Sequence, residues 1–345
     1  MVLKMDVSKL QWCLRNNDAD PRSYAGAAKI AEDLGYAGMY SVEGTSRAAL
    51  PQFLSGNVRS AFVNSAAAIL STSRIKVGTS IISMYSRTPL AVAMESSTLN
   101  EMSGGRFVLG VGTGGPWLVE HGYGYPLDRP ATRMKEFLKI FKSATSGDET
   151  SLDGEFFKVS TIKMNKIAPR PKVLMAGINP AILRIGGALA DGVILNMYPL
   201  KAIPFARQYI NEGAEKAGRD PKEVELYVLA SCGTSNNENV LNQLKVGISF
   251  YCHVETHHKF LDYAGLGDSA RNIHQTWLDK GPDVAAKLIT QDLLDELTLG
   301  YDAKTIAKRS KQFLDANVYP LLYPHYQKEQ GIGEALQLMK ELKAA

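Results

Sequence analysis

Short apolar runs alternate with segments of helical periodicity along almost the whole chain. The runs are bounded by glycine, proline and polar residues, which is typical of buried parallel strands. Between them, apolar residues recur every three or four positions, as they do in helices that cover a sheet. Eight strands are predicted in this way, at residues 10–14, 37–43, 75–82, 107–112, 171–177, 191–197, 225–232 and 316–323.

Helix signals separate these strands at the expected places. Pro21 begins an apolar-periodic segment that ends at Leu34-Gly35, and Thr88-Pro89 begins another that reaches Met102. Proline in the first turn and glycine just after the last turn are typical helix boundaries. Eight strand–helix units predict an α/β fold, a closed (β/α)8 TIM barrel in preference to an open sheet.

Two segments lie outside this alternation. LDGEFFKV, at residues 152–159, predicts a short hairpin between the fourth and fifth strands. Residues 235–300 interrupt the rhythm after the seventh strand, and we expect a helical insertion there, at the catalytic end of the barrel. No internal repeat or low-complexity tract divides the chain, so residues 1–345 are predicted to form a single barrel domain.

Composition and charge exclude several kinds of partner. The formal net charge of +4 is mild, far from the strongly basic profile of a nucleic-acid binder. The first residues lack the apolar core of a signal peptide, and no apolar run approaches the ~18 residues of a membrane span. We therefore expect a cytoplasmic protein without a membrane partner. Cys13, Cys232 and Cys252 show no C-x-x-C spacing, so neither a disulfide framework nor a zinc site is indicated.

The glycine-rich sequence SGGRFVLGVGTGGPW, at residues 103–117, contains a G-x-G-x-x-G pattern. In a Rossmann turn the third glycine opens a helix that faces the pyrophosphate of a dinucleotide. Here Pro116, Gly122, Gly124 and Pro126 follow, and they argue against such a helix. The loop predicts either a backbone surface for a flat ring or phosphate, or a tight turn without a ligand.

Longer stretches resemble the luciferase-like flavin and deazaflavin oxidoreductases. SRIKVGTSIISMYSRTPLAVAMESSTLNEMSGGRFVLGVGTGG, at residues 73–115, is similar to the third and fourth barrel units of that family. PKVLMAGINPAILRIGGALADGVILNM, at residues 171–197, is similar to the fifth and sixth, and LDGEFFKV also matches. Two stretches, NPAILRIGGALADGVILN and INEGAEKAGRDP, resemble the branch that uses coenzyme F420 and includes the methylenetetrahydromethanopterin reductases.

One departure from that branch concerns the end of the second strand. Many F420-dependent members carry an Asp-His pair there, whereas this chain has Ser41-Val42-Glu43-Gly44. The resemblance therefore implies the cofactor and the reaction type, and it leaves the substrate open.

The resemblance implies a cofactor site at the ends of the third and fourth strands. Ser80-Ile81 would hold a non-prolyl cis peptide bond, which forms a bulge behind the central ring of the cofactor. The alternative is an ordinary strand end. Gly112, Thr113 and Gly114 would lie beside the cofactor, where larger side chains could not fit.

The connection after the fifth strand offers a second part of this site. It contains Ala176, Gly177, Ile178 and Asn179, and it leads into a helix predicted to begin at Pro180. Proline suits the first helical turn and asparagine suits the cap. The free N–H groups of such a helix start can bind a phosphate or a polar ring edge, or the cap can be purely structural.

Two polar residues end predicted strands at the rim where barrels place their chemistry. Glu43 ends the second strand and is the candidate catalytic residue, which would bond to the ring or supply a proton after hydride transfer. A solvated loop carboxylate is the alternative. Asn196 ends the sixth strand and would bond to a ring or substrate carbonyl, or simply end the strand.

Histidine and cysteine residues give weaker signals. His253 and His257 in HVETHH are four residues apart, but the spacing shows no further ligands, so we expect surface histidines and no metal site. Cys232 and His325 lie near the ends of the seventh and eighth strands and could line the pocket, although neither has a visible catalytic partner.

The sequence thus predicts an F420-dependent oxidoreductase that transfers a hydride between the deazaflavin and a small organic substrate. An FMN-dependent monooxygenase of the same fold, supplied by a flavin reductase partner, is the first alternative. A non-catalytic flavin-binding protein is the second. A homo-oligomer, dimer or tetramer, is the expected assembly.

Overall fold

The computed structural model describes residues 5–15, 20–43, 59–327 and 331–345. Its main sheet has the strand order β3-β2-β1-β11-β10-β9-β8-β5-β4, and β3 also pairs with β5. All of these pairings are parallel, so the sheet closes into a barrel. The barrel strands are β1 (Gln11–Leu14), β2 (Gly38–Ser41), β3 (Lys76–Thr79), β4 (Ile82–Ser83), β5 (Phe107–Gly112), β8 (Lys172–Ala176), β9 (Gly192–Asn196), β10 (Glu225–Gly233) and β11 (Tyr319–His325).

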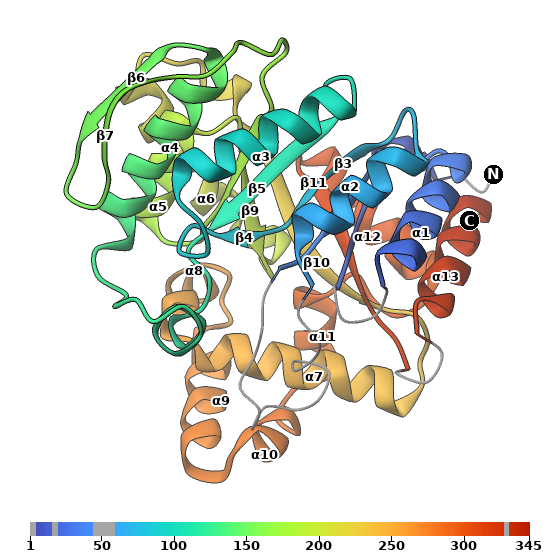
Figure 1. Ribbon diagram of the computed structural model, residues 1–345. Helices are drawn as coiled ribbons and strands as arrows, with labels where there is room; N and C mark the ends of the chain where they lie inside the picture. The colour runs from blue at the N-terminus through green and yellow to red at the C-terminus, as the bar shows by residue number, and fades with distance from the viewer. Residues whose placement is uncertain (1–4, 16–19, 44–58, 328–330) are drawn as a thin grey trace.

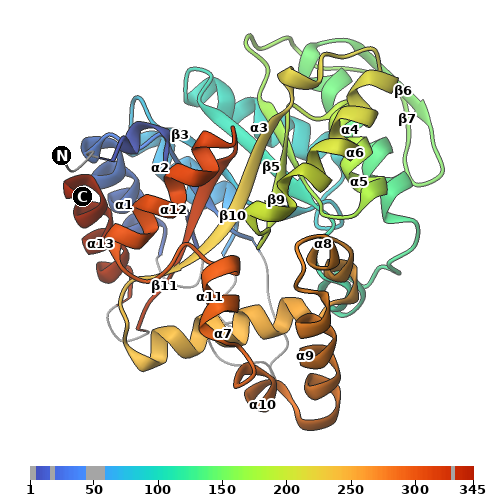
Figure 2. The same ribbon diagram turned by 180° about the vertical axis from the view of Figure 1, so that it is seen from behind.

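Helices surround this barrel, as the two opposite views show (Figures 1 and 2). The predicted TIM barrel is therefore confirmed. The covering helices are α1 (Pro21–Leu34), α2 (Ala61–Ser71), α3 (Pro89–Met102), α4 (Pro130–Ser146), α5 (Pro180–Leu189), α6 (Ile203–Lys216), α12 (Ala303–Asp315) and α13 (Gly333–Ala344). The predicted hairpin is formed by the antiparallel strands β6 (Glu149–Asp153) and β7 (Lys158–Lys163).

Between β10 and α12 the chain forms a group of helices at one end of the barrel (Figure 1). The longest, α7, lies against the barrel, and α9 and α10 pack on its outer side. These helices are α7 (Glu238–His253), α8 (His258–Tyr263), α9 (Gly267–Lys280), α10 (Pro282–Ala286) and α11 (Gln291–Leu297).

Two of the eight predicted strands differ from the structure in an informative way. The third is interrupted, because β3 ends at Thr79 and β4 begins at Ile82. The eighth begins three residues later than predicted, at Tyr319, because α12 continues to Asp315 and Asn317 adopts a positive φ of 57°. His325 therefore belongs to the strand itself.

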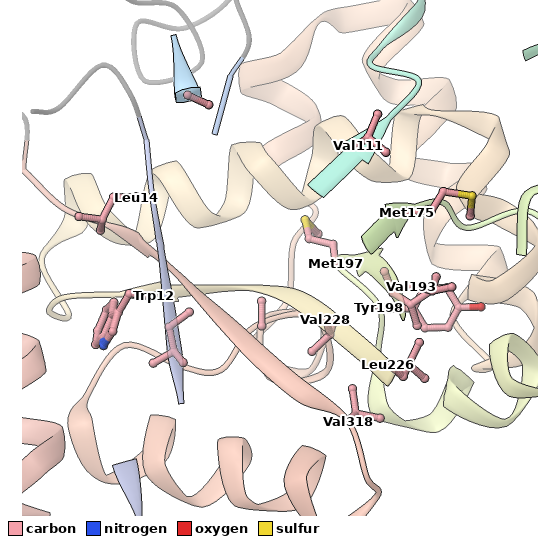
Figure 3. Close-up of a cluster of buried hydrophobic side chains, with 14 of the residues drawn as sticks. Trp12, Leu14, Val111, Met175, Val193, Met197, Tyr198, Leu226, Val228 and Val318 are labelled. Carbon is pink, nitrogen blue, oxygen red and sulfur yellow. The ribbon is translucent and has the colours of Figure 1, made fainter. Parts of the chain in front are cut away.

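The buried side chains form two layers, as expected for a barrel covered by helices. The larger layer lies between the strands and the helices, and Figure 3 shows part of it, with Val111, Met175 and Val193 on neighbouring strands. The smaller layer fills the barrel interior. Its buried members are Cys13, Tyr40, Val108, Leu174, Ile194, Tyr227 and Leu321.

Two further findings concern only the described part of the chain. None of its helices combines the length and apolar character that crossing a bilayer requires. Within the same residues, no group of three or more histidine, cysteine or acidic side chains is placed so that it could hold a metal ion.

Candidate active site

The predicted site residues lie at the carboxyl ends of the barrel strands or in the loops that follow them. In a closed parallel barrel these ends meet at one rim, which is where barrel enzymes carry their catalytic groups. They are Glu43 after β2, Ser80 and Ile81 between β3 and β4, Gly112, Thr113 and Gly114 at and after the end of β5, Ala176, Gly177, Ile178 and Asn179 at and after the end of β8, and Asn196 at the end of β9.

Three of these residues meet at the rim and form an apolar surface, which we call the Ile81 floor. It consists of Ile81, Gly112 and Ala176. A Cβ atom added at Gly112 would lie 2.5 Å from Cδ1 of Ile81 and 3.1 Å from Cβ of Ala176. The Ile81 side chain thus fills the space that a larger residue at position 112 would need. Ile81 and Ala176 are half-buried and pack on the barrel interior.

Backbone hydrogen bonds fix the segment that carries Ile81. The peptide bond between Ser80 and Ile81 is cis, as the family resemblance implied. The Ser80 N–H donates to the carbonyl of Ser41 at 2.9 Å, and the Glu43 N–H donates to the carbonyl of Ile81 at 3.1 Å. The Cys13 thiol lies 3.7 Å from the Ser80 carbonyl oxygen, to which it donates. The segment is therefore held by both β1 and β2.

The glycine loop after β5 is fixed to β4. The Met84 N–H donates to the carbonyl of Gly112 at 2.8 Å, and the Ser83 hydroxyl donates to the carbonyl of Thr113 at 2.7 Å. Gly114 has a φ of 83°, a conformation that favours glycine. The loop is therefore held in place, and its glycines at positions 112 and 114 carry no side chains.

The chain after this loop is not a Rossmann turn. A short helical segment of π type follows at Leu118–Gly122, and the next long helix, α4, begins only at Pro130. A dinucleotide turn requires a long helix that starts directly at the third glycine. The G-x-G-x-x-G pattern alone would have suggested a dinucleotide site. The prolines and glycines that follow it correctly predicted that no such helix forms.

Glu43 is not a solvated loop carboxylate, so that alternative is wrong. Its side chain is 6% exposed and forms an ion pair with Arg87, with Oε1 at 2.5 Å from Nη1. Oε2 accepts from Nη2 of Arg87 at 3.2 Å and from the N–H of Ala61, the first residue of α2, at 2.9 Å. The carboxylate therefore joins the end of β2 to the starts of α2 and α3.

Arg87 was not among the residues predicted from the sequence. Burial acts to lower its pKa, but the hydrogen bonds and charge of Glu43 outweigh this, and the pKa is raised. The guanidinium also lies 5.0 Å from the ring centre of Phe62 and 3.4 Å from the carboxylate of Glu95. Its position directly before the Thr88 helix cap is a signal that could have indicated a residue at the rim.

The start of α5 offers fewer free donors than expected. Pro180 has no N–H, the N–H of Ile182 donates to Oδ1 of Asn179 at 3.0 Å, and that of Leu183 donates to the Asn179 carbonyl at 2.9 Å. Among the first four helical positions, only the N–H of Ala181 is not engaged by these contacts. The predicted cap at Asn179 is confirmed, whereas its ligand role stays a prediction.

The two residues before this cap are shaped by packing. A Cβ atom on Gly177 would collide with the side chain of Ile182. Ile178 is half-buried and packs against the outer hydrophobic layer. Glycine at position 177 is therefore required by the approach of α5, whether or not a ligand binds nearby.

Asn196 has a neighbour from a distant part of the chain. The side chain of Tyr251 in α7 lies close enough to Asn196 for that residue to affect the pKa of the Tyr251 hydroxyl. Burial raises the pKa of the Tyr251 hydroxyl, and the contact with Asn196 offsets part of that effect. α7 thus reaches the end of β9 and contributes to the rim. No signal in the sequence connects these two residues.

Ser231 and His325 form a second polar pair, on β10 and β11. Nε2 of His325 lies 3.3 Å from the Ser231 hydroxyl oxygen. Burial lowers the pKa of His325 well below its usual range, and the positive charge of Arg15 lowers it further. Cys232, by contrast, packs in the outer layer between barrel and helices. The suggestion that Cys232 lines the pocket is therefore wrong, because neighbouring strand residues point to opposite faces.

The histidines of HVETHH are not ordinary surface residues. His257 is 6% exposed, and burial lowers its pKa to about 4. The His253 ring stacks on those of His274 and Trp277, with centroid distances of 5.1 and 5.0 Å. The stacked rings pack the end of α7 against α9. The spacing of the histidines in the sequence could not predict this packing, because it depends on a second helix.

The chain is similar in sequence to several reductases. It is 34% identical to the 5,10-methylenetetrahydromethanopterin reductase of Methanolobus tindarius over 161 residues, which are 47% of this chain and 49% of that protein. The match thus spans about half the length of that relative. It is 27% identical to the enzyme of the same name from Archaeoglobus fulgidus over 255 residues, which are 72% of this chain and 76% of that protein.

A solved structure and a family model also match this chain. The coenzyme F420-dependent tetrahydromethanopterin reductase of Methanopyrus kandleri superposes with a TM-score of 0.76 over 95% of this chain and 97% of that chain, at 22% sequence identity. At this identity the likeness concerns the barrel fold. The luciferase-like monooxygenase family matches residues 8–318, most of the chain. The protein therefore belongs to the luciferase-like monooxygenase family.

Proposed function

We propose that this protein is a coenzyme F420-dependent oxidoreductase, which transfers a hydride between the deazaflavin and a small organic substrate. Membership of the luciferase-like family supports an oxidoreductase. The reductases of Methanolobus tindarius and Archaeoglobus fulgidus are sequence relatives, and the similar structure from Methanopyrus kandleri is F420-dependent by name. The observation in this structure that carries the proposal is the Ile81 floor at the barrel rim.

The residues at the rim fit a flat tricyclic ring. The floor is apolar, half-buried and bordered by a glycine loop, and Gly112 contributes only backbone above the Ile81 side chain. A planar aromatic ring can lie flat on such a surface, because no side chain projects from the glycine positions. Its binding is then favoured by the removal of apolar area from water. The thiol of Cys13 and the bonded backbone of Ser80 support the floor from below.

Each part of the rim then has a separate task. When bound, F420 supplies a two-electron centre that accepts or donates a hydride. The Ile81 floor orients one face of the ring and leaves the other face to the substrate. Asn196 and Tyr251 offer polar groups at the end of β9, and the Glu43–Arg87 pair holds the rim of β2 in place. Positioning of this kind lowers the barrier by reducing the entropy lost in the reaction.

Methylenetetrahydromethanopterin is the first substrate to test, because two sequence relatives carry its name. The second-strand end of this chain differs from the Asp-His pair of many F420-dependent members. Ser41-Val42-Glu43 occupies that position, and Glu43 is engaged by Arg87. The proposal therefore leaves the substrate open and includes small organic molecules that are not pterins.

Identification of the bound cofactor tests this function directly. The purified protein would be denatured, and the released cofactor identified by mass spectrometry and by its ultraviolet–visible spectrum. F420, or tight binding of added F420, supports the proposal. Release of FMN, and binding of FMN in preference to F420, would instead support the monooxygenase supplied by a flavin reductase.

A second measurement separates an enzyme from a flavin-binding protein. Protein loaded with F420 would be mixed in a stopped-flow instrument with candidate hydride donors, and protein loaded with reduced F420 with acceptors. A change in the deazaflavin absorbance with at least one compound is expected. Binding without any such change across the panel would favour the non-catalytic alternative.

We further propose that the protein is a homo-oligomer. Large apolar side chains are exposed on the outer faces of two neighbouring helices: Val63 and Leu70 on α2, and Met94 and Met102 on α3. Apolar groups gathered on a surface are typical of interfaces. Light scattering coupled to size-exclusion chromatography should give a mass of two or four chains, and a monomer would contradict this proposal.

A further inference from the structure

A cavity of about 260 Å³ lies at the amino ends of the barrel strands. The residues that line it include the first residues of four strands: Gln11 of β1, Lys76 of β3, Glu225 of β10 and Tyr319 of β11. The proposed cofactor site lies at the carboxyl ends of the strands, and the inner layer of buried side chains lies between the two ends. The cavity is therefore outside the candidate active site, at the end of the barrel away from α7 (Figure 1).

Gln11 contributes a buried amide to the wall of this cavity. Its side chain is 3% exposed, and its Oε1 atom has no hydrogen-bond partner among the described residues. The amide lies beside Gly38 of β2, where an added Cβ atom would be 2.8 Å from Oε1, so glycine at position 38 leaves the room that the amide needs. A buried polar oxygen without a hydrogen bond costs free energy. A donor group that enters the cavity would remove this cost.

Tyr227 and Glu225 form a second polar part of the wall. The Tyr227 hydroxyl donates to Oε2 of Glu225 at 2.8 Å, and Oε1 of Glu225 lies 3.0 Å from Nζ of Lys172. The charge of this carboxylate is thus balanced by Lys172. Burial raises the pKa of Tyr227, so its hydroxyl stays protonated, and the phenol oxygen is able to accept a hydrogen bond from a ligand.

Two lysines give the cavity a positive charge. Lys9 and Lys76 line it, and neither forms an ion pair with a carboxylate of the described part of the chain. Hydrogen bonds from Ser8 lower the pKa of Asp6, and the charge of Lys9 contributes to this, but the Asp6 carboxylate is already engaged by the N–H and hydroxyl of Ser8. Since Glu225 is balanced by Lys172, the two lysines favour an anion.

We propose that this cavity binds a small organic anion that also carries hydroxyl groups, a phosphate ester or a hydroxycarboxylate. Its charge lies near Lys9 and Lys76, and its hydroxyl groups donate to Gln11 and Tyr227. The volume is below the ~300–1,000 Å³ of pockets for drug-sized ligands, so the occupant is smaller than these. The inference does not depend on the proposed function, because the residues that carry it lie at the other end of the barrel.

Titration with simple probes tests the site without knowledge of the natural ligand. Glycerol 3-phosphate and glycerate are the two anions, and glycerol is the neutral counterpart that keeps hydroxyl groups. Affinity would be measured by isothermal titration calorimetry, and Tm with and without each probe.

Four variants show where the probes bind. Gln11→Met and Lys76→Met change the cavity. Lys139→Met is the matched control for Lys76→Met, because Lys139 is exposed on the outer helix α4. Gly112→Val, at the rim, tests whether the anions bind at the proposed cofactor site instead.

Both anions should bind the unmodified protein at one site per chain and raise its Tm, because a ligand that binds only the folded state stabilises it. Glycerol should bind about tenfold more weakly or not at all, and Lys76→Met and Gln11→Met should each weaken anion binding by about tenfold. Lys139→Met and Gly112→Val should bind the anions as the unmodified protein does. Gln11→Met should not lower the Tm of the free protein, because it removes a buried oxygen that has no partner. A loss of affinity without a loss of stability is not expected of a glutamine that is purely structural.

Three results would overturn the inference. They are no binding of either anion, glycerol binding as tight as that of the anions, and unchanged anion affinity in both Gln11→Met and Lys76→Met. Loss of anion binding in Gly112→Val but not in Lys76→Met would also overturn it, because the anions would then lie at the rim. The tighter of the two anions identifies the ligand as a phosphate ester or a carboxylate. Binding of F420, followed by its fluorescence, is a separate measurement, and its failure would concern the proposed function alone.

Discussion

The ion pair between Glu43 and Arg87 gives the sharpest quantitative prediction. Loss of one partner of a buried ion pair costs about 3–5 kcal/mol, because the other charge is left without compensation. Arg87 is 22% exposed and retains Glu95 at 3.4 Å, which reduces that cost. Glu43→Ala also removes the acceptor for the Ala61 N–H at the start of α2. We therefore expect Glu43→Ala to lower the free energy of unfolding by about 3 kcal/mol.

A double-mutant cycle isolates the pair from these other losses. Glu43→Ala, Arg87→Ala and the double variant would be unfolded in urea, and their free energies of unfolding compared at unchanged m-values. The coupling energy should be about 2 kcal/mol. A coupling below about 0.5 kcal/mol, the value of an ordinary surface pair, would refute the reasoning.

Substitutions at the same two positions, with Glu43→Gln added, address the catalytic assignment of Glu43. If its task is to hold the rim, F420 affinity should fall in both single variants, because either change releases the end of β2. If Glu43 itself bonds to the ring or transfers a proton, Glu43→Gln should slow hydride transfer, and Arg87→Ala should do so much less. F420 titrations on Glu43→Ala and Arg87→Ala, and stopped-flow rates on Glu43→Gln and Arg87→Ala, distinguish these cases.

Three further predictions follow from particular contacts. Gly112→Val should displace Ile81 from the floor and abolish F420 binding measured by fluorescence, whereas Gly115→Val, with no atom within 4 Å of the added Cβ, should bind normally; equal affinities would remove Gly112 from the site. Burial lowers the pKa of His257 from 6.5 to about 4, so the unfolded chain takes up the proton first, and the free energy of unfolding should fall by about 3 kcal/mol as the pH falls from 6.5 to 4. His257→Phe should lack this part of the pH dependence in denaturant titrations, and an unchanged slope would contradict it. Glu32 accepts the N–H groups of Ser73, Arg74 and Ile75 at 2.9, 2.6 and 3.0 Å, which leaves its pKa lowered although burial acts to raise it. Glu32→Ala should cost about 3 kcal/mol near neutral pH, and progressively less as the pH falls from 4.5, the usual carboxyl pKa, through the lower pKa of the folded state; a loss that does not depend on pH would exclude the charged hydrogen bonds as its cause.

The sequence determined the order of strands and helices because their boundaries depend on local chemistry. Phe107–Gly112 and Pro89–Met102 were predicted with the bounds that the structure shows, and the start of α5 at Pro180 was also predicted, since proline, glycine and cap residues mark such boundaries. The prolines and glycines after Gly115 likewise excluded a Rossmann turn. A run of eight such units is enough to predict a barrel, and the family resemblance placed the cofactor residues on it.

Contacts between distant segments were decided only by the tertiary structure. The carboxylate of Glu43 binds Arg87 across 44 residues, and Tyr251 lies near Asn196 although its helix, α7, comes only after the next strand, β10. No local pattern encodes these pairs, because they depend on how the rim closes and on where α7 crosses it.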